Sequence, residues 1–175
     1  MLSRLFRAAA NRKVIDRIHG EIVAAARDRT LFIDYGIEDT LEGRFEALLV
    51  HSAIVLHKLQ TLPEPGPEVA QDVADALFRH FDAGLREMGV GDLSVPKRIK
   101  TIAAAYLGRA KAYQDACGKD RLALAAALSR NVYAGKNNGA RLAQYVEQLN
   151  VKLNDLALED FLTGPIPFPR PCDIG

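Results

Sequence analysis

Histidine is the residue type in this sequence best suited to metal or haem chemistry, and it occurs four times, at His19, His51, His57 and His80. A helical metal site commonly places two histidines four residues apart, so that both rings lie on one face. His51 and His57 are six residues apart, which puts them on opposite faces of a helix. His19 stands alone as a candidate haem ligand. We therefore predict no metal and no cofactor.

Carboxylates and a thiol are the other candidates for catalysis. Closely spaced aspartates on a helix could hold magnesium against a diphosphate, and such a set occurs at Asp72, Asp75 and Asp82. No second acidic group faces it, and acids near a helix start also stabilise the macrodipole. Cys117 is followed by Lys119 and Arg121, which would lower its pKa, but it lacks a positioned histidine or aspartate. Phosphate-loop, dinucleotide and zinc-protease motifs are absent from the sequence. We predict that the protein is not an enzyme.

Composition indicates a folded chain with one domain. The sequence has 175 residues, 49% of them hydrophobic, with 23 bases and 22 acids. The longest stretch without charge is 47–57, whereas a membrane-spanning helix needs about 20 apolar residues. We expect a single helical domain over residues 1–175, with an N-terminal arm at 1–10, an extended proline-rich tail at 164–175 and a cytoplasmic location.

Charge is unevenly distributed along the chain. Residues 30–95 hold four bases and twelve acids, whereas residues 96–141 hold ten bases and two acids. Such asymmetry favours either a basic face that attracts RNA or anionic lipid, or internal pairing of the two segments. The sequence leaves both alternatives open.

Helices must position these side chains, because apolar residues recur at spacings of three and four throughout the sequence. The proline cluster at 63–67 and Gly89 mark helix ends, and Ser94 with Pro96 marks a helix start. We predict helices over 14–26, 45–59, 69–88, 95 to near 118, 122–132 and 142–156, with a turn or helical stub at 31–35. The predicted fold class is all-α, a single irregular helical bundle of about six to eight helices.

The junction between the predicted helices 69–88 and 95–118 carries unusual charges. Arg86 and Glu87 end one helix, and Lys97, Arg98 and Lys100 open the next. Cations at a helix N-terminus cost a few tenths of a kcal/mol or more each. These bases therefore call for an acidic partner, either within the fold or outside it.

The same junction resembles a known family. The phrase Leu-Arg-Glu-Met-Gly-Val-Gly-Asp-Leu-Ser-Val-Pro-Lys at 85–97 is similar to the central signature of the ubiquinol–cytochrome c chaperones. Tyr-Leu-Gly-Arg at 106–109 is similar to the family's Phe-Tyr-Gly-Arg element, and residues 39–46 also resemble the family. The resemblance covers roughly residues 30–160, and the absence of a long presequence points to a bacterial, single-domain member.

The resemblance implies a non-enzymatic assembly factor for the cytochrome bc complex. Mitochondrial relatives bind newly made cytochrome b together with a small partner protein and contact the ribosome. A groove between helices would hold a segment of cytochrome b, flanked by charged side chains. The predicted partner-binding residues are Arg86, Glu87, Asp92, Lys97, Arg98, Lys100 and Arg109.

Two alternatives remain for the charged segments. The basic block 97–141 would suit an RNA- or ribosome-associated protein, with binding that weakens steeply with salt. The first helix carries Arg4, Arg7, Arg12 and Lys13 and could rest on an anionic membrane, giving a peripheral location at the inner membrane. We predict no contact with DNA.

Overall fold

Helix α3 (Leu41–Thr61) forms the centre of the molecule, and every residue from 46 to 56 is buried. It contacts α1, α4, α5, α6 and α7. This segment contains most of the longest uncharged stretch of the sequence, and a helix that is apolar on all sides is stable only when it is covered on all sides. The computed structural model describes residues 2–117 and 119–174, with side chains from residue 11 onward.

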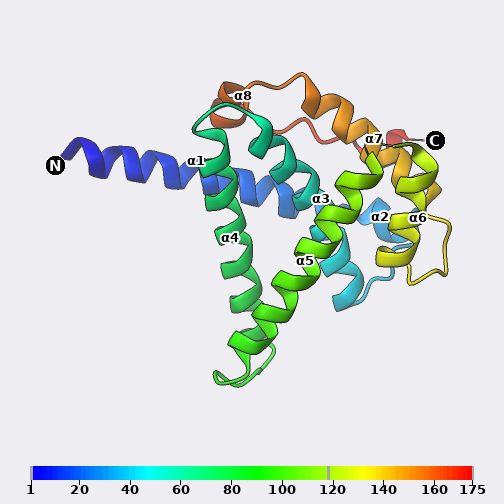
Figure 1. The fold of residues 1–175 in the computed structure, drawn as a ribbon. Helices are drawn as coiled ribbons and strands as arrows, with labels where there is room; N and C mark the ends of the chain where they lie inside the picture. Colours follow the sequence, from blue (N-terminus) through cyan, green and yellow to red (C-terminus); the bar gives the residue numbers. More distant parts are fainter. Residues whose placement is uncertain (1, 118, 175) are drawn as a thin grey trace.

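The described residues form eight α-helices and one short 3₁₀ turn, so the all-α bundle of six to eight helices is confirmed. The other described elements surround α3 or extend the bundle (Figure 1). Their bounds are α1 Leu2–Ala26, α2 Arg29–Ile33, α4 Gly66–Glu87, α5 Val95–Cys117, α6 Arg121–Val132, α7 Ala140–Asn154, α8 Leu158–Thr163 and the 3₁₀ turn η1 Pro171–Asp173.

Local chemistry explains where several helices begin. Asp28 accepts a hydrogen bond from the backbone N–H of Thr30 at 2.8 Å and caps α2. Thr40 and Asp120 cap α3 and α6 in the same way. Helix α5 begins at Val95, directly after Ser94, as the sequence predicts. These caps satisfy N–H groups that have no partner inside the helix.

A buried histidine ties α3 to α7. The Nδ1 of His51 lies 2.7 Å from the carbonyl oxygen of Ala47, and its Nε2 lies 2.9 Å from the hydroxyl of Tyr145. Since a carbonyl only accepts, Nδ1 donates to it and Nε2 accepts from the tyrosine. Burial lowers the pKa of His51 to about 4, so the ring is neutral at pH 7. We call these contacts the His51 network.

The C-terminal segment packs against the bundle. Residues 165–170 have no regular structure, yet Ile166 and Ile174 are buried. The hydroxyl of Tyr35 donates to the carbonyl of Pro171 at 2.9 Å, and the guanidinium of Arg141 donates to the carbonyl of Ile174 at 3.2 Å. Ile166, between two prolines, and Ile174, after the last proline, supply apolar contacts that the proline spacing alone did not reveal. Helix α8 and η1 were likewise not predicted.

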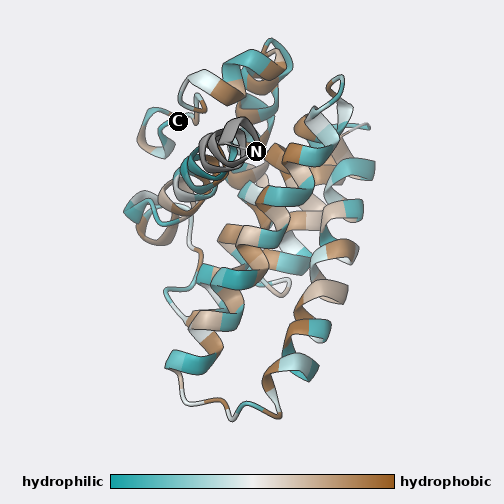
Figure 2. Ribbon diagram, turned by 90° about the vertical axis from the view of Figure 1, so that its left-hand side faces the viewer, coloured by the Kyte–Doolittle hydropathy of each residue, from teal (hydrophilic) through white to brown (hydrophobic). Residues whose placement is uncertain are grey.

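Helices α4 and α5 form a hairpin whose connecting turn lies at the far end from the remaining helices (Figure 1). Figure 2 shows the same turn from a second direction, again at the extremity of the molecule. The N-terminal half of α1 also projects from the bundle in Figure 1. The side chains of residues 1–10, where we predicted an N-terminal arm and the basic positions Arg4 and Arg7, lie outside the described residues.

Candidate partner-binding groove

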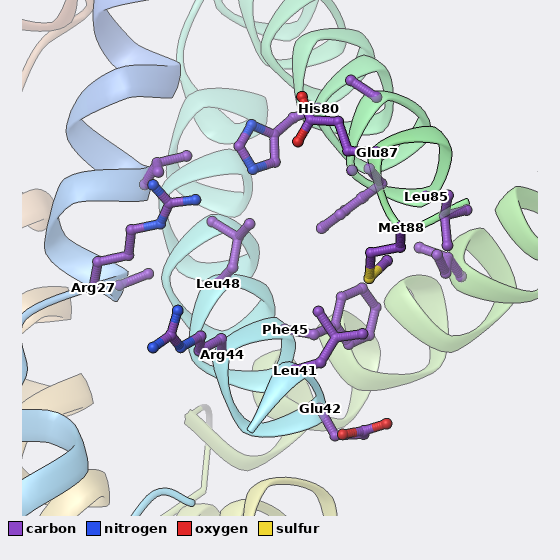
Figure 3. Close-up of a pocket in the computed structure, with 16 residues that line it drawn as sticks. Arg27, Leu41, Glu42, Arg44, Phe45, Leu48, His80, Leu85, Glu87 and Met88 are labelled. Carbon is purple, nitrogen blue, oxygen red and sulfur yellow. The ribbon is translucent and has the colours of Figure 1, made fainter. Parts of the chain in front are cut away.

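A groove of about 560 Å³ lies between α1, α3 and α4 and reaches α5. Charged side chains at its edges are Arg27, Glu42, Arg44 and Glu87. Figure 3 shows these residues around the opening, with Leu48 and Phe45 on α3 facing His80 and Met88 on α4. Its apolar lining consists of Val23, Ala26, Leu41, Phe45, Leu48, Phe81, Ala83, Leu85, Met88 and Ile102. A site with this lining binds apolar surface.

Aromatic rings make a firm wall on one side of the groove. The rings of Phe45 and Phe81 lie 5.1 Å apart between centroids, and Phe78 contacts Tyr106 edge-on at 6.0 Å. Such tilted arrangements are the favoured ones for aromatic pairs. Phe45 and Phe81 line the groove and join α3 to α4, whereas the contact of Phe78 with Tyr106 lies outside the lining and joins α4 to α5.

The apolar surface continues from the groove to the α4–α5 turn. A second hollow of about 480 Å³ shares Leu41, Leu85 and Met88 with the groove and ends at Ser94 and Arg98. Leu41 is 58% exposed and Met88 is 51% exposed. We call residues 88–100 the α4–α5 tip. The second hollow therefore lies between the groove and the end of the tip.

Two histidines approach each other beside the groove. The rings of His19 on α1 and His80 on α4 lie 5.3 Å apart between centroids. Burial lowers the pKa of each, and the proximity of the two rings lowers that of His19 further. The described residues contain no group of three or more side chains placed to hold a metal ion. The contact between the two rings packs α1 against α4.

The structure divides the seven predicted partner-binding residues into three groups. Glu87 lines the groove and Arg98 lines the second hollow. Arg86 bonds to Asp82 at 2.7 Å and also to Asp92, so it closes the end of α4 onto the turn.

Lys97 and Lys100 are exposed on the first turns of α5, and neither forms an ion pair with a described residue. Arg109 lies farther along α5, where its guanidinium holds Glu46 through two contacts of 2.6 and 2.7 Å. Burial raises the pKa of Glu46 even though the arginine opposes the shift. This pair joins α3 to α5, and Arg109 lies outside the lining of the groove.

The other candidates for catalysis are engaged in ordinary structural contacts. Asp72 accepts a hydrogen bond from Asn11, and Asp75 accepts one from Gln71. The amide of Asn150 lies 3.2 Å from the sulfur of Cys117. Burial raises the pKa of that thiol, whereas the nearby bases had predicted a lowered value. Desolvation outweighs those bases because none of them contacts the sulfur among the described residues.

Internal contacts engage half of the bases in the block 96–141. Arg109, Lys111, Arg121 and Lys136 pair with carboxylates, and Arg141 bonds to backbone carbonyls and lies over the ring of Tyr35. Glu38 and Glu46, two of the paired acids, belong to the acidic segment 30–95. The acidic and basic segments therefore pair in part within the fold.

Sequence reasoning missed most of the groove. Residues from the end of α1 and the start of α3 line it, and neither segment has a catalytic motif. The resemblance over residues 39–46 was the available signal, because Leu41, Glu42, Arg44 and Phe45 all line the groove. Apolar residues that line a groove have the same helical spacing as core residues. Only their solvent exposure in the folded protein distinguishes the two.

Comparisons with known proteins support the fold and identify the family. A family model described as Ubiquinol-cytochrome C chaperone matches residues 34–168. The crystal structure of the Cbp3 homolog from Brucella abortus is similar over 100% of both chains, with a TM-score of 0.89 and 34% sequence identity. No curated protein matches the sequence. The family match covers most of the chain and includes the α4–α5 junction, so the chain belongs to the ubiquinol–cytochrome c chaperone family.

Proposed function

We propose that the protein assists assembly of the cytochrome bc complex by holding a segment of newly made cytochrome b in the groove between α1, α3 and α4. Family membership supports the chaperone role. The observation that carries the proposal is the open apolar groove, which has a firm aromatic wall and side chains such as Met88 exposed to solvent. Such a surface is typical of a site for another apolar element.

The chemistry of the groove fits a transient binding site for a helix. An apolar helix presents side chains at spacings of three and four, and a trough between helices accepts one such row. Glu42, Arg44 and Glu87 at the edges would pair with polar residues at the ends of the bound segment. Exchange is easy because the site is open along one side, so cytochrome b can be released for insertion.

A charge placed in the groove tests this site. Met88→Glu and Leu41→Glu each put a carboxylate onto the apolar surface at a half-exposed position, so the fold tolerates them. Binding of cytochrome b made in a cell-free system should fall at least tenfold for each variant. Leu122→Glu is the matched control, because Leu122 is 81% exposed and lies on α6 outside the groove.

The same variants are then placed in a deletion strain. The reduced-minus-oxidised spectrum of its membranes should lose the b-type and c-type haem signals of the bc complex, and only the Leu122→Glu protein should restore them. Full binding and full restoration by the folded groove variants would show that the groove is not the site. Unchanged haem signals in the deletion strain itself would contradict a role in assembly of the bc complex.

Contacts with a small partner protein, with the ribosome and with a membrane surface extend this proposal and need their own tests. RNA or ribosome binding through residues 97–141 is the other candidate function, supported by the bases that remain exposed at the start of α5. If this function is correct, the affinity for RNA or ribosomes should fall steeply as the salt concentration rises. Binding that is insensitive to salt would contradict it.

A further inference from the structure

The α4–α5 tip exposes apolar side chains at the extremity of the molecule. Leu93 is 98% exposed, the highest value among the described large apolar residues, and Met88 is 51% exposed. The turn that carries them lies far from the other helices in both views (Figures 1 and 2). A scattered exposed leucine is ordinary on a protein surface, but this one stands at a protruding end.

Three bases stand directly beside Leu93. Lys97, Arg98 and Lys100 are exposed in the first two turns of α5, and none forms an ion pair within the described part of the chain. The acid in the turn, Asp92, is already engaged by Arg86. The charge of these three bases is therefore available to an external anion.

We propose that the α4–α5 tip docks onto an anionic lipid bilayer, with Leu93 inserted among the lipids and Lys97, Arg98 and Lys100 on the headgroup phosphates. The inference rests on the proposed function only in placing the protein beside a membrane. It concerns a surface separate from the groove lining, except for Met88, which lines the groove and belongs to the tip.

The dimensions of the tip suit a bilayer interface. Helix α5 begins at Val95, two residues after Leu93, and rises about 1.5 Å per residue, so the three bases lie within about 8 Å of its first residue along the helix axis. That distance matches the depth of about 5–10 Å to which interfacial segments enter a bilayer. In the docked protein, Leu93 would therefore lie at the boundary of the acyl chains. The three bases would lie at the level of the lipid headgroups.

Charge and shape favour lipid over the other partners. The side chain of Leu93 alone offers little area to a folded protein, for which a stable interface buries on the order of 800 Å² on each side. RNA would use the bases but has no use for an inserted leucine, and residues 88–100 contain no aromatic side chain for stacking on bases. Anionic lipid uses both features. Docking by the tip would also bring the mouth of the groove to the membrane surface.

Vesicle flotation with the purified full chain tests the proposal. Vesicles of phosphatidylcholine containing about one-third phosphatidylglycerol should bind the protein, and vesicles of phosphatidylcholine alone should not. Each base near an anionic surface contributes about fivefold, so replacing Lys97, Arg98 and Lys100 together by glutamine should weaken binding about 100-fold. The matched control replaces Lys119, Arg130 and Lys152 by glutamine, which changes the net charge equally and should have much less effect.

A tryptophan reporter tests insertion directly, because the sequence contains no tryptophan. The fluorescence of Leu93→Trp should shift to the blue on addition of the anionic vesicles. Leu122→Trp, at another highly exposed leucine, should show no shift. Leu93→Ser should weaken vesicle binding about tenfold, since it removes the inserted side chain.

Three results would overturn the proposal. They are no binding of the wild-type chain to anionic vesicles, equal loss of binding in the two glutamine triples, and no fluorescence shift for a vesicle-bound Leu93→Trp protein. Cytochrome b is absent from these experiments, so their failure leaves the groove proposal intact. Conversely, the Leu41→Glu variant, whose substitution lies outside the tip, should lose cytochrome b binding and keep its binding to vesicles.

Discussion

The middle of α3 and the α4–α5 tip differ in how far their side chains are buried and paired. Around the His51 network, polar atoms inside the core find partners, and the surrounding residues of α3 are buried. At the tip, Leu93 and Met88 face solvent and three bases lack partners among the described residues. A stable interior leaves little free to bind anything else. Exposed apolar surface beside unpaired charge remains free to bind a partner, which is why we propose binding sites at the groove and the tip.

The largest expected difference between the buried core and the tip is in the cost of removing a leucine. Leu128 on α6 is fully buried, so Leu128→Ala should lower the free energy of unfolding by about 3 kcal/mol. Leu93→Ala should change it by less than about 0.5 kcal/mol, since Leu93 loses no buried contact. Urea denaturation followed by circular dichroism measures both. Similar losses for the two variants would show that the tip is part of the core.

Two glycines in the left-handed backbone conformation extend the comparison between a packed region and the tip. Gly139 has φ +69°, and a Cβ there would lie 2.5 Å from the carbonyl oxygen of Ala125. Gly139→Ala should therefore cost more than about 2 kcal/mol of stability. Gly89 has φ +78° with open space around it, so Gly89→Ala should cost about 1 kcal/mol, from the backbone alone. Thermal unfolding of the pair provides the measurement, and equal costs would contradict the close approach at Gly139.

The His51 network should make stability fall in acid. The pKa of His51 is about 4 in the folded chain against an ordinary 6.5, so the unfolded chain binds more protons below pH 6.5. Stability is full above that value and is lost as the pH falls toward 4, by about 2 kcal/mol between about pH 7 and about pH 5. The lowered pKa values of His19 and His80 act in the same direction.

Denaturation curves at a series of pH values isolate the part due to His51. His51→Gln should be less stable than the wild type at neutral pH, because the ring of His51 is fully enclosed. Its stability should also fall less steeply with acid. A variant that keeps the full acid dependence would mean that other groups carry it.

The smallest expected effect separates two arginines. Arg109 and Glu46 are mostly buried, so Arg109→Met leaves a carboxylate without its partner and should cost about 1–2 kcal/mol. Arg86 is exposed, and Arg86→Met should leave the melting temperature unchanged. Calorimetry of both variants measures the contrast. A large loss at Arg86 would show that its contacts with Asp82 and Asp92 hold the tip in place.

Helices and their ends were predictable because they depend on neighbours in the sequence. The spacing of apolar residues indicated α3 to α7, and Gly89 and the prolines at 63–67 marked ends that the structure confirms. Helix α8 and the return of residues 164–174 across the bundle were not predicted, because their stability comes from contacts with Tyr35, Arg17 and other distant residues. Contacts of that kind leave no periodic pattern.

By itself, the sequence determined the helical class, the charged junction at 85–100 and the resemblance to a chaperone family, since each depends on residues close together in the chain. The tertiary structure decided which charges are free. Arg109 is committed to Glu46, 63 positions away in the sequence, whereas Lys97 and Lys100 are not engaged by any described acid. It also decided that the apolar residues of α1, α3 and α4 leave a groove instead of closing over it. The physical reason is that the burial and pairing of a side chain depend on contacts between elements that are distant in the sequence. Those contacts exist only in the folded chain.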